Sequence, residues 1–102
     1  MFQWLRRRRT WLEKIKSFTF QFDVPNKEVL RARGKGADIR LMFTFGILNV
    51  FLPPEEEWAD IAPETVRTSW RLLHDELAAW CNYNGVGLVV TAPEQSGIEF
   101  RT

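Results

Sequence analysis

His74 and Cys81 are the first residues to weigh for chemistry, because each is the only one of its type in the 102-residue chain. They lie seven positions apart on a predicted helix, which separates them by about 10 Å and puts them beyond hydrogen-bond reach. One histidine and one cysteine also cannot build a zinc site rich in those ligands within one chain. We therefore expect a protein that is not an enzyme and holds no cofactor. Cys81, beside Trp80, is expected to be a small buried hydrophobic residue, and His74 to lie at the boundary or surface.

Basic side chains are the stronger lead. A hairpin predicted around Lys35 and Gly36 places Arg31 directly opposite Arg40, with Arg33 nearby, and like charges in such positions cost some tenths of a kcal/mol. An anion could offset that cost: an acidic side chain of the same chain, a phosphate, or a carboxylate of a partner. We expect Arg31, Arg33, Lys35 and Arg40 to form a partner-binding surface.

The N-terminal stretch FQWLRRRRTWLEKIK adds a second group of cations. Residues 2–17 place apolar side chains on one face of a helix, and Arg8 interrupts that face. Arg6, Arg7 and Arg9 are left as a charged ridge on the helix, which we expect to bind a partner. A competing signal is the capping-box pattern of Thr10 and Glu13. It would start the helix at Trp11 and leave residues 1–9 as a flexible basic arm.

Acidic residues gather in the stretch PPEEEWADIA, which we expect to be a loop. Glu55, Glu56 and Glu57 could chelate a hard cation, although metal sites normally draw oxygen ligands from several segments, so a solvated loop is the simpler expectation. Trp58 has two interpretations. It could anchor an interface with a partner, together with Glu55, Glu56 and Glu57 as partner-binding residues, or fold back to cap the core.

The elements that position these residues follow from periodicity. SFTFQFDV alternates as a half-buried strand, and a loop at Val24–Asn26 would place Phe20 opposite Leu30. In the hairpin, Leu30 then faces Leu41 and Ala32 faces Ile39, so that apolar meets apolar. After Gly46 the alternation shifts, which predicts a bulge before the strand ends at Pro53.

A second helix is predicted from Pro63 to the stop signal Asn84-Gly85. Its apolar stripe consists of Val66, Trp70, Leu73, Leu77 and Trp80. The tail reads as a buried strand, a turn through Pro93 to Gly97, and a short final strand. The element order is α-β-β-β-α-β-β. It predicts a single α+β domain over residues 1–102, a two-layer sandwich with an antiparallel sheet of about five strands and two helices on one face.

Charge and composition limit the function. Residues 1–40 carry eleven basic and four acidic side chains, whereas residues 41–102 carry three basic and nine acidic ones, so the two halves differ strongly in charge. A lone cysteine and the lack of an apolar leader favour a reducing, cytoplasmic location. The longest apolar stretch, IRLMFTFGILNVFL, is interrupted by polar residues and falls short of the roughly 20 needed to span a bilayer.

These features together predict a small binding protein of the adaptor or inhibitor type that docks on a protein or nucleoprotein through charged surfaces. Phage anti-defence inhibitors are one such class, a comparison that rests on size, aromatic content, charge and missing catalytic groups. The alternative is a sequence-neutral nucleic-acid binder that uses the basic half. Peripheral membrane docking through the N-terminal helix is a third possibility, and a homodimer would pair the basic half of one copy with the acidic half of another.

Overall fold

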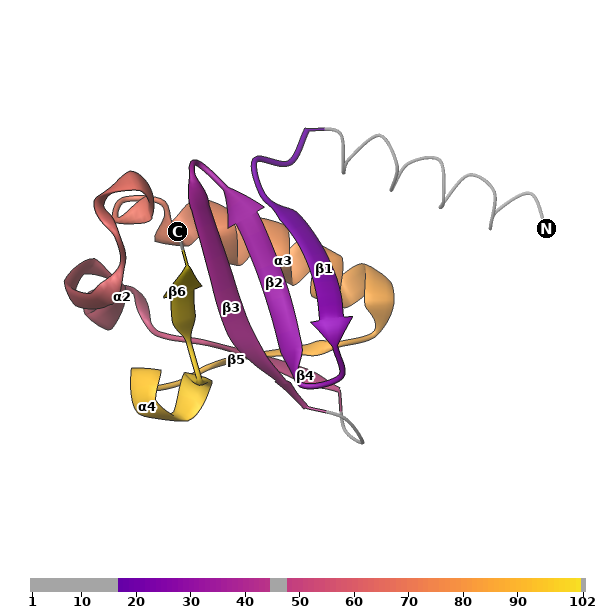
Figure 1. Cartoon of the computed structure of the whole chain (residues 1–102). Coiled ribbons are helices and arrows are strands. Elements are labelled where there is room, and N and C mark those ends of the chain that lie inside the picture. The colour runs from indigo at the N-terminus through magenta and orange to yellow at the C-terminus, as the bar shows by residue number, and fades with distance from the viewer. Residues whose placement is uncertain (1–16, 45–47, 102) are drawn as a thin grey trace.

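The computed structural model describes residues 17–44 and 48–101. They form a mixed α+β fold with a six-stranded sheet, shown in Figure 1. The elements in chain order are β1 (Gln21–Asn26), β2 (Val29–Gly34), β3 (Ala37–Thr44), β4 (Asn49–Leu52), α2 (Glu55–Ile61), the 3-10 turn η1 (Glu64–Val66), α3 (Trp70–Asn84), β5 (Gly87–Val90), α4 (Pro93–Ser96) and β6 (Glu99–Arg101). The predicted helix over residues 2–17 and the alternative basic arm over 1–9 lie outside the described residues. The strand that was predicted to continue past Gly46 to Pro53 with a bulge is instead two strands, because β4 runs antiparallel to β3 and pairs with its end.

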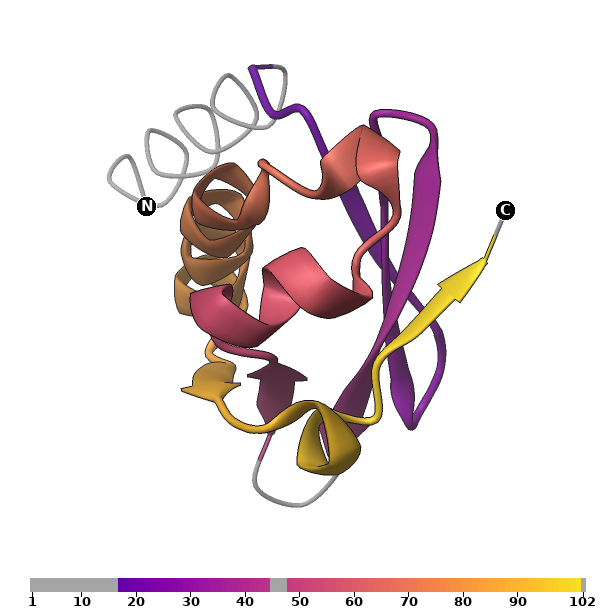
Figure 2. The same cartoon turned by 90° about the vertical axis from the view of Figure 1, so that its left-hand side faces the viewer.

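The described elements form two layers. Figure 2 shows α3 and α2 on the same side of the sheet. No described helix lies on the other side of β1, β2 and β3. The core lies between the layers and is built from fully buried side chains on both, including Leu30, Ile39, Trp58, Leu73 and Leu77. The α+β character and two-layer arrangement agree with the sequence-based prediction.

The β2–β3 hairpin has the predicted register. Arg31 pairs with Arg40, Ala32 with Ile39 and Leu30 with Leu41. Lys35 and Gly36 form its tip with positive φ angles of 50° and 77°, the combination that a tight hairpin turn requires. The two apolar pairs face the core, so turn chemistry and burial select the same register.

The predicted register of β1 is wrong by four residues. The predicted pairing of Phe20 with Leu30 would put Phe18 opposite Ala32, but Phe22 lies there. The chain turns at Lys27 and Glu28 instead of at Val24–Asn26, because the Asn26 side chain accepts the Glu28 N–H at 3.0 Å and closes the turn locally. Since the shift is an even number, the side chains keep their faces.

The sheet is not antiparallel throughout, which corrects the prediction. β5 pairs with β4 in parallel, after a crossover that contains α2, η1 and α3. The last strand, β6, lies antiparallel beside the first half of β3, while β4 pairs with the end of β3. The chain therefore returns at its C-terminal end to the strand that carries Arg40.

The second predicted helix is present in two parts, η1 and α3, and ends as expected at Gly85, which adopts the left-handed conformation with φ of 70°. Val66, Leu73 and Leu77 of its stripe are fully buried. None of the helices in the described part of the chain is long and apolar enough to cross a bilayer.

Candidate binding surface on the outer face of the sheet

The side of β1, β2, β3 and β6 that faces away from α3 carries two rows of charged and polar side chains, which follow from strand register. One row runs through Asp23, Arg31, Arg40 and Glu99, and the next through Gln21, Arg33, Asp38 and Arg101. We call these eight residues the charged rows. Alternation along each strand places them on the face opposite the core.

Arg31 is neutralised within the chain. Its guanidinium donates two hydrogen bonds to the carboxylate of Asp23, one of them from Nε at 2.9 Å. These bonds hold the pKa of Asp23 below its usual value, and the same bonds raise the pKa of Arg31. Arg33 lies 3.9 Å from the same carboxylate. Of the three anions that could offset the Arg31–Arg40 repulsion, the structure contains the first, an acid of the chain itself.

Arg40 is paired less completely. Its Nε lies 3.5 Å from Oδ1 of Asp38, and neither of these two buried atoms has a hydrogen-bond partner within the described residues. Arg101 donates to Glu99 at 2.8 Å, which lowers the pKa of that carboxyl group. The charged rows thus hold four guanidinium groups against three carboxylates, and Arg40 retains hydrogen-bonding capacity.

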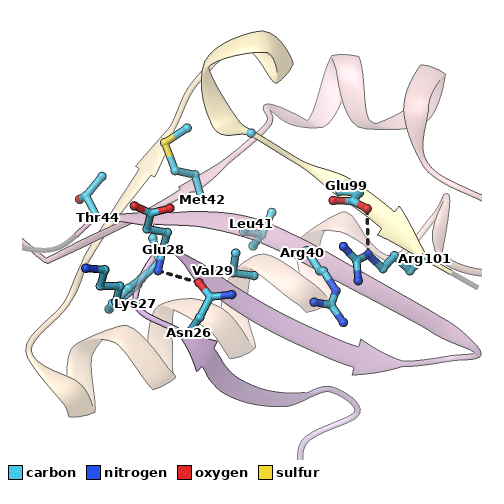
Figure 3. Close-up of a pocket in the computed structure, with 12 residues that line it drawn as sticks. Asn26, Lys27, Glu28, Val29, Arg40, Leu41, Met42, Thr44, Glu99 and Arg101 are labelled. Atoms are coloured by element: carbon cyan, nitrogen blue, oxygen red, sulfur yellow. Dashed lines mark hydrogen bonds and ion pairs between the residues drawn. The ribbon is translucent and has the colours of Figure 1, made fainter.

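A groove with a volume of about 710 Å³ opens next to the charged rows. Figure 3 shows Arg40, Glu99 and Arg101 at one end and Lys27, Glu28 and Met42 at the other. Its lining residues are Asn26, Lys27, Glu28, Val29, Arg40, Leu41, Met42, Phe43, Thr44, Gly97, Glu99 and Arg101. The groove therefore lies between the β1–β2 turn, β3 and the segment that joins α4 to β6.

The groove combines apolar and charged parts. Val29 and Met42 are cross-strand partners on its floor, and Met42 is 38% exposed. The Met42 side chain lies against Gly97, where an added Cβ would come within 3.0 Å of its terminal methyl group. An exposed apolar patch bordered by charges is typical of a surface that binds a partner.

Of the predicted basic residues that lie in the described part of the chain, one lines this groove. Arg40 does so, whereas Arg31 and Arg33 lie on the same face beyond it. Lys35 points elsewhere, since its Nζ donates to Ser69 Oγ at 3.0 Å, just before α3. Arg6, Arg7 and Arg9 lie outside the described residues.

The predicted acidic loop is wrong, because Glu55, Glu56 and Glu57 form the first turn of α2 after Pro54. Acidic residues favour this position, since the helix dipole is positive at its N-terminal end. Glu55 accepts a hydrogen bond from Arg71 at 2.9 Å. Within residues 17–44 and 48–101 no cluster of three or more His, Cys, Asp or Glu side chains could hold a metal ion.

Trp58 belongs to the core, which contradicts its use as an exposed interface anchor. Its side chain is 1% exposed, its indole N–H donates to the Val66 carbonyl at 3.0 Å, and its ring meets Phe100 edge-on at 5.3 Å. The other interpretation, that Trp58 folds back onto the core, is confirmed. Consequently, the acidic segment offers no aromatic anchor to a partner.

Cys81 and His74 lie as expected. Cys81 is 2% exposed, and burial raises the pKa of its thiol to about 12, so it remains protonated at neutral pH. His74 stacks on Trp70 with ring centroids 4.9 Å apart and is partly exposed. The two side chains take part in separate contacts.

Several groove residues were missed from the sequence, namely Lys27, Glu28, Glu99 and Arg101. The sequence does place Val29 and Met42 on the exposed side of the hairpin, which was a usable signal. Nothing local indicates that β6 pairs with β3, and this pairing brings Glu99 and Arg101 to Arg40.

Comparisons of the chain with protein-family models, with curated proteins and with solved structures found no match.

Proposed function

We propose that this chain is a small non-enzymatic binding protein of the adaptor or inhibitor type, cytoplasmic, which docks on a macromolecular partner through the outer face of its sheet. One observation carries the proposal. The outer face has a groove with a partly exposed apolar part, Val29 and Met42, next to charged side chains, and no described helix covers it.

The structure changes which residues support this proposal. Arg31 and Arg33 share the Asp23 carboxylate, so their charge does not require an external anion. Arg40 supports the proposal better, since it lines the groove and is paired only loosely with Asp38, at 3.5 Å. The expected contacts are therefore Arg40, Met42 and the groove rim.

The test compares capture of partners from the native cell by the full chain, by Met42→Glu and by the control Leu72→Glu. Leu72 is as exposed as Met42, at 37% against 38%, but lies on α3, on the opposite side of the molecule. We expect the wild type and L72E to capture the same macromolecule. M42E should capture at least about tenfold less of it, because the new carboxylate would have to be desolvated at the contact. Equal capture by all three folded proteins would refute docking through this face.

Sequence-neutral binding to nucleic acid is a second candidate, favoured by the excess of basic side chains in residues 1–40. On the described outer face it has little support, because the exposed positions of β1, β2, β3 and β6 carry no aromatic ring for base stacking. A gel-shift series with random duplex DNA tests it. Binding that weakens tenfold or more between low and moderate salt would favour nucleic acid, and no shift at micromolar protein would exclude it.

A further inference from the structure

The groove has a chemical asymmetry that specifies its occupant more closely. Arg40 lies at one end and is paired only loosely with Asp38, at 3.5 Å. Met42 lies two residues further along the same strand with its side chain partly exposed. Residues i and i+2 of a strand point to the same side and are about 7 Å apart. The groove therefore presents a cation and an apolar side chain two residues apart, which is the repeat of side chains on one face of an extended peptide.

We propose, building on the docking function above, that the groove binds an extended peptide segment of a partner protein in which an acidic side chain and an apolar side chain stand two residues apart. The acidic side chain meets the Arg40 guanidinium. The apolar side chain packs on Met42 and Val29. An extended peptide lying along β3 has the same two-residue repeat as the floor, so both contacts form at once.

Charge supports an anion at the Arg40 end. The four arginines of the charged rows face only three carboxylates. Asp23 is committed to Arg31 by two hydrogen bonds, and Glu99 to Arg101 by one. Asp38 contacts Arg40 only at 3.5 Å without a hydrogen bond. Because Arg40 Nε is buried against Asp38, a ligand carboxylate would accept its charge-assisted bonds from the two terminal amino groups of the guanidinium.

The same charges disfavour a nucleic acid in this groove. Asp38 and Glu99 adjoin the site, and they would repel a nucleic acid strand, which carries a phosphate at every nucleotide. A peptide with one carboxylate needs only the Arg40 guanidinium. The groove volume of about 710 Å³ also lies within the range of about 300–1,000 Å³ typical of ligand pockets, which suits a few side chains.

The test selects binders for the full-length chain from a random displayed octapeptide library and measures the best peptide by fluorescence anisotropy. We expect Asp or Glu to be enriched two positions from Leu, Ile, Met or Phe. Arg40→Gln should weaken binding by about tenfold or more, the magnitude of a lost charge-assisted hydrogen bond. The control Arg67→Gln, which removes an exposed arginine beside η1, should bind as the wild type does. Replacing the acidic side chain of the peptide by its amide should weaken binding to the wild type as much as R40Q does. The amide peptide should bind R40Q no more weakly than the acidic peptide does.

Four results would overturn the proposal: no enrichment of any peptide, enrichment without an acidic position, equal weakening by R40Q and R67Q, or displacement of the peptide by an eight-nucleotide single strand at equal concentration. The general docking function is tested separately by M42E in the capture experiment. A partner lost by M42E but unaffected by R40Q would leave docking in place and refute the acidic-peptide assignment alone.

Discussion

Glu76 determines where the chain enters the sheet. It lies on α3 and is only 8% exposed, yet its carboxylate is satisfied, because its two oxygens accept the backbone N–H groups of Thr19 at 2.9 Å and Phe20 at 2.8 Å. A helical side chain thereby fixes the segment that leads into β1. Its sequence context, an acid on a predicted helix, gives no indication of this contact.

We predict that Glu76→Ala destabilises the protein by about 2–4 kcal/mol, because it leaves two backbone donors without partners near the core. Asp75→Asn is the control, since Asp75 is the exposed neighbour on the same helix, and it should change the free energy of unfolding by no more than about 0.5 kcal/mol. Urea unfolding at neutral pH measures both. Similar values for the two variants would show that the Glu76 contact does not stabilise the fold.

Asp23 gives the outer face a pH dependence. Its pKa is lowered in the folded protein by its hydrogen bonds to Arg31, so its stabilising contribution is present above the unfolded pKa and is lost as pH falls through the lower folded value. Because the side chain is 42% exposed, solvent screening keeps that contribution below about 1 kcal/mol. We expect Asp23→Asn to be slightly less stable than the wild type at about pH 7 and equal to it at about pH 2. A difference that persists unchanged at the lower pH would contradict the ion pair.

Cys81 should behave as a reporter of unfolding. Because burial raises the pKa of its thiol to about 12, almost no thiolate forms near neutral pH, and the side chain is only 2% exposed. A disulfide reagent at about pH 8 should therefore label the native protein very slowly and the protein in denaturant at the rate of a free thiol. Rapid labelling of the folded chain would place the cysteine at the surface.

Among the elements, the β2–β3 hairpin has two glycines that are required for different reasons. At Gly34 an added Cβ would lie 2.7 Å from the Thr19 carbonyl oxygen, a backbone atom that cannot swing away. At Gly36 nothing lies within 4 Å, but φ is +77°. Gly34 is thus required by a close approach of the chain and Gly36 by turn geometry.

We predict that Gly34→Ala costs about 1–3 kcal/mol through steric overlap, whereas Gly36→Ala costs about 1 kcal/mol through backbone strain alone. Thermal unfolding of the two variants separates the cases, and each serves as the other's comparison. A smaller loss for Gly34→Ala would mean that the Thr19 segment relaxes away from β2.

The hairpin could be predicted from the sequence because its information is local. Lys35 and Gly36 specify the turn, and the apolar alternation on both sides then allows a single register. The register of β1 also depended on a turn, but Pro25 drew the predicted loop to Val24–Asn26, while the Asn26 side chain closes it at Lys27 and Glu28. The resulting error moved residues along the strand and left their faces unchanged.

The site was less predictable than the fold, because it depends on contacts between distant segments. The acidic residues after two prolines were predicted to form a loop, although Pro54 and the three glutamates also suit the start of a helix. Trp58 is buried only because that helix forms. The like-charged pair of Arg31 and Arg40 was correctly placed. Its neutralisation by Asp23 was missed, since the predicted register of β1 did not bring Asp23 opposite Arg31.

At the scale of the whole molecule, β6 links the core to the candidate binding surface. Phe100 faces inward and meets Trp58 edge-on, while its neighbours Glu99 and Arg101 line the groove. The strand has only three residues and pairs with β3 alone among the described strands. One groove wall is therefore a short element that is held in place by its pairing with β3 and by an aromatic contact made on the other side of the sheet.

This arrangement predicts that Phe100→Ala impairs binding although the ring does not face the groove. Without the Trp58 contact, β6 should detach locally, and the amides of Glu99–Arg101 should exchange with solvent faster than those of the β2–β3 hairpin, since local opening needs less free energy than global unfolding. Phe22→Ala is the control, because Phe22 is also half-buried on the inner face and packs on a tryptophan, Trp80, at 6.3 Å, but lies on β1 away from the groove. Hydrogen exchange and binding of the selected octapeptide should both change in F100A and remain near wild type in F22A. Equal effects in the two variants would mean that general stability, and not the docking of β6, controls the groove.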